Sequence, residues 1–145
     1  MVFVDTNILV YSSDRDSPFY GIARQRLQKL ADQFSVVCIS NQVLREYIGV
    51  VTRLDIAKRQ YNPEQIAYDI SQFEKQFHVL QEDHETRQRL LYLLTHTVIG
   101  GKQIHDANLI ATALQNNIKS FCTHNVADFK RFDRLIKVIP LLDNN

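Results

Sequence analysis

Four acidic residues stand out because each lies beside an apolar stretch that is typical of a core strand or helix. They are Asp5, Glu46, Asp106 and Asp128. A lone carboxylate is costly to bury, and several carboxylates gathered together repel one another unless a cation neutralises them. Carboxylate oxygens are hard ligands that suit Mg²⁺ or Mn²⁺. The four acids together therefore predict a site for a divalent cation.

A cation held in this way is suited to the hydrolysis of phosphodiesters. One metal ion polarises a phosphoryl oxygen and generates hydroxide from bound water, and a second ion about 4 Å away can stabilise the leaving oxygen. The set therefore indicates a metal-dependent hydrolase, with a nuclease as the first candidate. Each acid also has a plainer interpretation: Asp5 or Asp128 as a cap or turn residue, Asp106 as a helix-dipole residue, and Glu46 as an exposed helix residue.

The elements that must position these acids are short strands and longer helices. Runs rich in strand-forming apolar residues predict buried strands at residues 2–4, 36–39, 78–81, 121–123 and 137–139. Asp5 directly follows the first of these strands. Ligands bind beyond the carboxyl ends of the strands in open α/β sheets, so this position favours a site residue.

Helices are predicted between the strands, where a capping residue precedes apolar residues at helical spacing. The expected caps are Ser17, Asn41, Asn62 and Asp83, with Gln65 placed for a capping box. The helix after Asp83 is expected to run to about Val98 and to end at Gly100 and Gly101, and another to cover residues 103–116. The alternation predicts an α/β fold, a central parallel sheet of four to five short strands flanked by helices.

Length and composition narrow the class of protein. The 145 residues suit one domain, 1–145. A net charge of +1 is not that of a protein that coats nucleic acid, so RNA or DNA binding would depend on local basic clusters. The two cysteines lie in apolar runs and are expected to be buried, reduced thiols. No secretion signal or membrane-spanning run is evident, which favours a cytoplasmic protein without membrane contact.

In their order and spacing the acidic segments resemble those of PIN-domain ribonucleases, and most of all the toxins of VapBC-type toxin–antitoxin pairs. The matching segments are residues 2–7, 43–47, 105–107 and 123–129. The resemblance covers nearly the full length and implies an endoribonuclease that uses one or two Mg²⁺ or Mn²⁺ ions. It also implies RNA as substrate, an antitoxin protein as partner, and a homodimer.

The resemblance assigns roles residue by residue. Asp5, Glu46 and Asp106 match the three central acidic positions, as catalytic residues and metal ligands. Asp128 is expected as a fourth, and Asn125 is the other candidate for that position. The residues expected to hydrogen-bond the ligands are Thr6, Asn7, Thr123 and Asn125. The residues themselves, rather than the resemblance, suggest the substrate contacts Arg45, Lys102 and His105, and other basic candidates include Arg53 and Arg131. Lys102 is favoured because it shortly precedes Asp106.

Three alternatives stay open or are disfavoured. A housekeeping PIN ribonuclease would have the same acids without an antitoxin. A PIN domain that binds RNA or protein without cutting is disfavoured by the intact acidic set. A receiver-type signalling domain needs an acidic pair after the first strand, where this chain has Asp5, Thr6 and Asn7.

Overall fold

The computed structural model describes residues 1–143. Five parallel strands form one sheet in the order β3-β2-β1-β4-β5. They are β1 (Val2–Val4), β2 (Val37–Ser40), β3 (His78–Leu80), β4 (Ser120–Thr123) and β5 (Lys137–Pro140). This confirms the expected α/β class and its central parallel sheet. Residues 144 and 145, which the expected domain included, lie outside the described residues.

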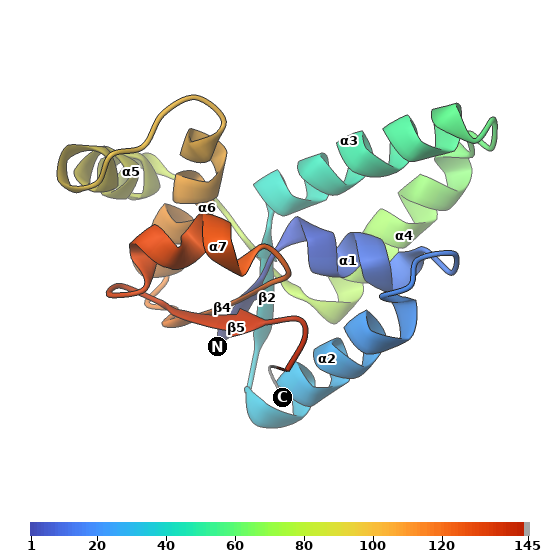
Figure 1. Ribbon diagram of the computed structural model, residues 1–145, viewed down its shortest axis with the longest axis horizontal. Helices are drawn as coiled ribbons and strands as arrows, with labels where there is room; N and C mark the ends of the chain where they lie inside the picture. The colour runs from blue at the N-terminus through green and yellow to red at the C-terminus, as the bar shows by residue number, and fades with distance from the viewer. Residues whose placement is uncertain (144–145) are drawn as a thin grey trace.

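Seven helices connect or flank the strands in the described part of the chain. They are α1 (Thr6–Ser13), α2 (Tyr20–Gln33), α3 (Asn41–Ala57), α4 (Pro63–Gln76), α5 (His84–His96), α6 (Gln103–Gln115) and α7 (Val126–Phe129), followed by a 3₁₀ turn, η1 (Lys130–Phe132). In Figure 1 the α3–α4 pair and the α5–α6 pair extend to opposite sides of the molecule. No helix within residues 1–143 is long and apolar enough to cross a membrane.

The core is centred on β1, the middle strand of the sheet. Every residue of β1 is fully buried, as a strand in the middle of a parallel sheet requires. Phe3 of β1 contacts Phe121 of β4 edge to face, with ring centroids 5.5 Å apart. Cys38 and Cys122 are buried and free, as expected. The backbone N–H of Asp5 donates to the Cys122 carbonyl, so the first acid is fixed at the end of both strands.

The start of α2 differs from the prediction. The helix begins at Tyr20, and Phe19 occupies the cap position without a side-chain cap bond. Ser17 instead forms a turn, in which its hydroxyl accepts from the Phe19 N–H and its carbonyl accepts from the Tyr20 N–H. Ser17 therefore belongs to a turn that precedes the helix.

The cap of α3 was also predicted one residue too late. The Ser40 hydroxyl accepts a bond from the Val43 N–H and caps the helix, so Asn41 is the first helical residue. The Asn41 side chain instead donates to Gln81. Ser40, buried at the end of β2, therefore has the capping role that was predicted for Asn41.

Two other helices also differ from the prediction, because α4 lacks the expected capping box and α5 ends earlier than expected. Asn62 caps α4 as expected, but the Gln65 side chain bonds Asp69, so the reciprocal half of a capping box is absent. Asp83 caps α5 as predicted. That helix ends at His96, short of Val98, so the glycines do not cap it. Gly101, with a φ of +56°, instead lies in the turn that leads into α6.

Candidate active site

A cavity of about 520 Å³ brings together three of the four predicted acids, Asp5, Glu46 and Asp106. It lies among α1, α3, α6 and the loop after β4. The candidate site residues that line it are Asp5, Thr6, Asn7, Glu46, Asp106 and Asn125. The acids belong to three different helical segments and are up to a hundred residues apart in the chain, so the fold rather than local sequence gathers them.

Asp5 is the most constrained of the acids. It is 6% exposed and is the N-cap of α1. Its Oδ1 accepts from the Thr6 N–H at 2.7 Å, and its Oδ2 accepts from the Asn7 amide at 2.9 Å and the Thr123 hydroxyl at 2.6 Å. Burial nevertheless raises the pKa of Asp5 to about 6, and the nearby carboxylates of Glu46 and Asp106 contribute to this rise.

Glu46 lies on α3 and is held at both oxygens. Its Oε2 accepts from the Thr6 hydroxyl at 2.7 Å, and its Oε1 accepts from the Gln42 amide at 2.8 Å. Thr6 therefore joins two acids, because its backbone N–H binds Asp5 while its hydroxyl binds Glu46. The sequence indicated Thr6 as a hydrogen-bonding residue but gave no role to Gln42.

Asp106 lies in the first turn of α6 and is half-buried. Burial raises its pKa to about 6, and the carboxylates of Asp128 and Glu46 raise it further, while Arg131 and His105 act in the opposite direction. The acids therefore interact electrostatically even though they are carried by separate elements. A cation among them would remove this mutual repulsion.

The fourth acidic position involves two residues after β4. Asn125 lines the cavity, and its backbone N–H donates to the Thr123 hydroxyl at 3.0 Å. Asp128 is exposed on α7 and does not line the cavity, but its charge acts on Asp106. Asn125 thus contacts the cavity directly, and Asp128 influences it through the effect of its charge on Asp106.

The donor chemistry fits a hard divalent cation, although the ligands are not gathered into a finished site. Across residues 1–143, no three Asp, Glu, His or Cys side chains are arranged to hold one metal ion. Both oxygens of Asp5 and of Glu46 already accept hydrogen bonds from protein donors. What fits is the type of donor: carboxylate oxygens with no competing thiolate around one cavity.

The three predicted substrate residues do not line the cavity. Arg45 and Lys102 are exposed, and neither lines the cavity. His105 is exposed and contributes its backbone carbonyl, which accepts from Gln42. Arg53, which was only one of several basic candidates, does line the cavity. Its place two helical turns after Glu46 is the sequence signal that could have singled it out.

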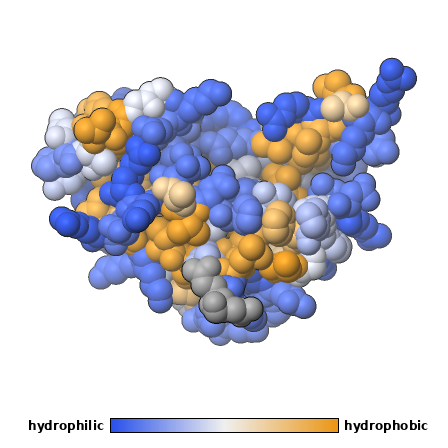
Figure 2. Space-filling model, in the orientation of Figure 1, coloured by the Kyte–Doolittle hydropathy of each residue, from blue (hydrophilic) through white to orange (hydrophobic). Residues whose placement is uncertain are grey.

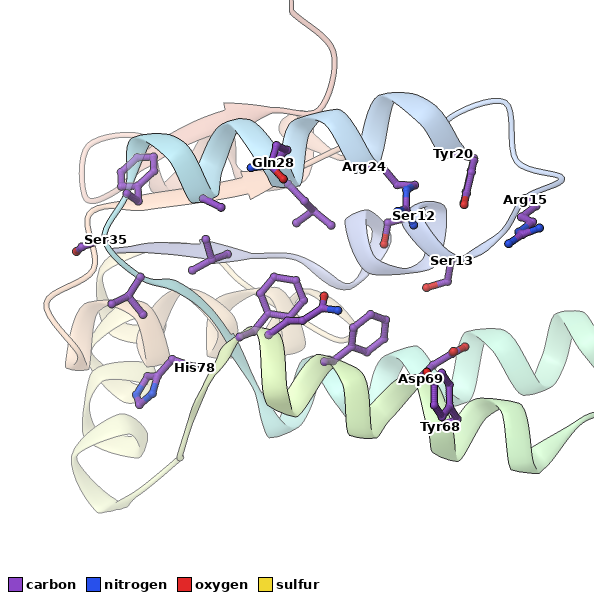
Figure 3. A pocket seen from close by; sticks show the side chains of 18 of the residues that line it. Ser12, Ser13, Arg15, Tyr20, Arg24, Gln28, Ser35, Tyr68, Asp69 and His78 are labelled. Carbon is purple, nitrogen blue, oxygen red and sulfur yellow. The ribbon is translucent and has the colours of Figure 1, made fainter.

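A larger cavity lies elsewhere. It has a volume of about 980 Å³ and extends between α2 and α4 past the end of α1. Figure 3 shows Arg24 and Gln28 on α2, and Tyr68 and Asp69 on α4, around this space. None of the candidate metal ligands lines it, so cavity size alone would have pointed away from the acids.

Comparison with known proteins adds a family to this geometry. The model of the PIN domain family matches residues 2–135. Ribonuclease VapC48 of Mycobacterium tuberculosis is 25% identical over 131 residues, which are 89% of this chain and 90% of that protein. The structure of VapBC2 from Rickettsia felis bound to a promoter DNA fragment aligns with a TM-score of 0.68 and 21% identity, over 97% of this chain and 98% of that one. Mycobacterium tuberculosis VapC20, described as a sarcin–ricin-loop-cleaving toxin, aligns with a TM-score of 0.63 and 17% identity, over 83% and 87%.

Proposed function

This chain belongs to the PIN domain family, and we propose that it is a divalent-metal-dependent endoribonuclease, the toxin of a toxin–antitoxin pair. The observation that carries the proposal is that Asp5, Glu46 and Asp106 line one cavity of a PIN domain. Similarity to a ribonuclease over most of both chains supports RNA as the substrate. Solved relatives that are toxin–antitoxin complexes support the partner.

Asp5, Glu46 and Asp106 would hold one or two Mg²⁺ or Mn²⁺ ions, with Asn125 and Asp128 as the candidates for a fourth position. The bound metal would polarise the scissile phosphate and supply hydroxide. Thr6, Asn7 and Thr123 orient the Asp5 and Glu46 carboxylates through the hydrogen bonds described above.

Arg53 at the cavity and Arg131 near Asp106 are the cations best placed for RNA phosphates. Phosphate contacts of this kind position RNA without reading its bases. They replace Arg45 and Lys102 as our first candidates, because Arg53 lines the cavity and the charge of Arg131 acts on Asp106, whereas neither Arg45 nor Lys102 lines the cavity. The preference rests on proximity to the acids, and salt-dependent binding by single variants tests it.

Neighbouring cavities that share lining residues lead toward the acids. The large cavity of Figure 3 and a second one of about 430 Å³ are both lined by Ser13, Arg15, Gln65 and Asp69. The second cavity and the acidic cavity share Val10 and Leu54. We propose that the antitoxin binds along this series of cavities and covers the acids. If a small gene adjoins the gene of this chain, expressing the two products together and measuring whether they copurify distinguishes a toxin from a housekeeping ribonuclease.

The expected homodimer has a candidate surface on α5. Leu91 and Leu94 are 46% and 44% exposed, and Val98, just beyond the helix, is 96% exposed. Leu91 and Leu94 are one helical turn apart on α5, and Figure 2 shows hydrophobic surface on the α5 side of the molecule. We propose that a second copy of the chain covers this stripe, since exposed apolar stripes of this kind are typical of interaction sites.

The first experiment is RNA cleavage by the purified chain. A mixture of tRNA and total RNA is incubated with Mg²⁺, Mn²⁺ or EDTA, with wild type, Asp106→Asn and a matched control, Glu74→Gln. Glu74 is an exposed acid on α4 and does not line the cavity. Cleavage that needs metal, is lost in Asp106→Asn and survives in Glu74→Gln is expected. A folded wild type that binds metal and RNA but leaves all RNA intact would favour a binding domain instead.

A further inference from the structure

Gln42 is a buried polar residue one helical turn before Glu46, and it is only 3% exposed. Its amide nitrogen donates to Glu46 Oε1 and to the His105 carbonyl, each at 2.8 Å. Its amide oxygen accepts from the Asn108 side chain at 2.7 Å. One side chain thus contacts the acid on α3 and two residues that flank Asp106 on α6.

The orientation of this amide is fixed by its partners. A carboxylate and a backbone carbonyl can only accept hydrogen bonds, so the nitrogen of Gln42 must face Glu46 and His105. Asn108 presents its NH₂ group to the oxygen of Gln42. Both amide hydrogens are used, and turning the amide over would oppose donor to donor and acceptor to acceptor. The side chain is therefore held in one conformation.

We infer that Gln42 is a positioning residue that sets where the Glu46 carboxylate lies relative to the first turn of α6, and so tunes the affinity of the site for its divalent cation. The inference rests on the proposed function, since it concerns the same site. Glu46 and Asp106 are carried by different helices, and Gln42 hydrogen-bonds both the Glu46 carboxylate and the residue that precedes Asp106. No family position or motif in the sequence assigned it a role.

The bond from Gln42 also restrains the Glu46 carboxylate. A donor on Oε1 and the Thr6 hydroxyl on Oε2 leave the Glu46 carboxylate little freedom to rotate. A carboxylate fixed in this way loses less conformational freedom when it binds an ion. Residues that orient metal ligands typically change metal affinity by about 10- to 100-fold when they are replaced.

The test measures Mn²⁺ binding by calorimetry on the full chain, in parallel with thermal unfolding in EDTA. Gln42→Met keeps the length and burial of the side chain and removes its three hydrogen bonds. Asn108→Ala removes only the bond that orients Gln42, at a half-buried position, and so remains informative if Gln42→Met folds poorly. Thr112→Val is the matched control, because Thr112 is fully buried on the same helix and its hydroxyl bonds only the Asn108 carbonyl.

The expected result is a Kd for Mn²⁺ about 10- to 100-fold higher in Gln42→Met, a smaller increase in Asn108→Ala, and no change in Thr112→Val. Cleavage by Gln42→Met should approach the wild-type rate when Mn²⁺ is raised to saturation. An unchanged Kd in folded Gln42→Met and Asn108→Ala, with only a lower melting temperature, would overturn the inference. A wild type that binds Mn²⁺ without cutting RNA would overturn the proposed function instead, because the Gln42 comparison measures metal binding.

Discussion

Replacing Asp5 with asparagine is expected to stabilise the metal-free protein at pH 8. Burial raises the pKa of Asp5 from an ordinary value of 3.8 to about 6. Between these two values the folded chain holds a proton that the unfolded chain has lost, so stability falls as the pH rises through this window. At roughly 1.4 kcal/mol per pH unit, the ionised carboxylate destabilises the fold at pH 8 by about 3 kcal/mol.

The substitution removes this penalty but disturbs one hydrogen bond. The asparagine oxygen can still accept from Asn7 and Thr123, as Oδ2 of Asp5 does. The amide nitrogen then faces the Thr6 N–H, which loses its acceptor at a cost of about 1 kcal/mol. The net gain is about 2 kcal/mol, which corresponds to a rise in melting temperature of roughly 4–8 °C for a chain of this size.

The assay is denaturant unfolding in EDTA at pH 4.5, 6 and 8, for wild type, Asp5→Asn and the control Asp32→Asn, an exposed acid on α2. The advantage of Asp5→Asn should grow by about 2 kcal/mol from pH 4.5 to pH 8, while the control difference stays flat. Added Mn²⁺ should stabilise wild type and not Asp5→Asn. An Asp5→Asn difference that is the same at every pH would refute the reasoning, since it would show that burial of this charge costs the fold nothing.

Three further outcomes are expected. Asp106→Asn should abolish metal-dependent cleavage while RNA binding persists, as measured by gel assay and by fluorescence anisotropy. Arg53→Ala should weaken RNA binding on all sequences and reduce the slope of log affinity against log salt by about 1, without changing the Mn²⁺ affinity; an unchanged slope would exclude a phosphate contact. Leu94→Glu with Val98→Glu should convert a dimer to a monomer in sedimentation experiments, and wild type that is already monomeric at high concentration would refute the α5 interface.

The fold could be predicted from sequence because its signals are local. The five strands are short apolar runs, and all five appear within a residue or two of the expected ranges. Asn62 and Asp83 cap the helices that follow them. The errors occur where two neighbouring residues can perform the same task. Ser40 and Asn41 both favour a cap position, and only the end of β2 decides between them.

The site was less accessible to sequence reasoning, because its contacts join distant segments. Asp5, Glu46 and Asp106 were singled out by their types and their neighbours, and the structure brings them to one cavity. Gln42 carries no such signal, since a glutamine on a helix is most often exposed. Its role depends on where α6 lies relative to α3, which no pattern within α3 encodes. Lys102 was favoured because it lies close to Asp106 in the sequence. That closeness does not place its side chain in the cavity.

Asp5 shows that the plain and the functional interpretation of a residue can both hold. It caps α1, as the plain interpretation required, and it also lines the acidic cavity. If it were only a cap, an exposed serine or asparagine would serve as well, and nothing would be gained by burying a carboxylate beside two others. The raised pKa of Asp5 shows that the metal-free fold is less stable with this carboxylate ionised. A cost of that kind is retained where function needs it, and a cation that binds the folded chain alone would offset it.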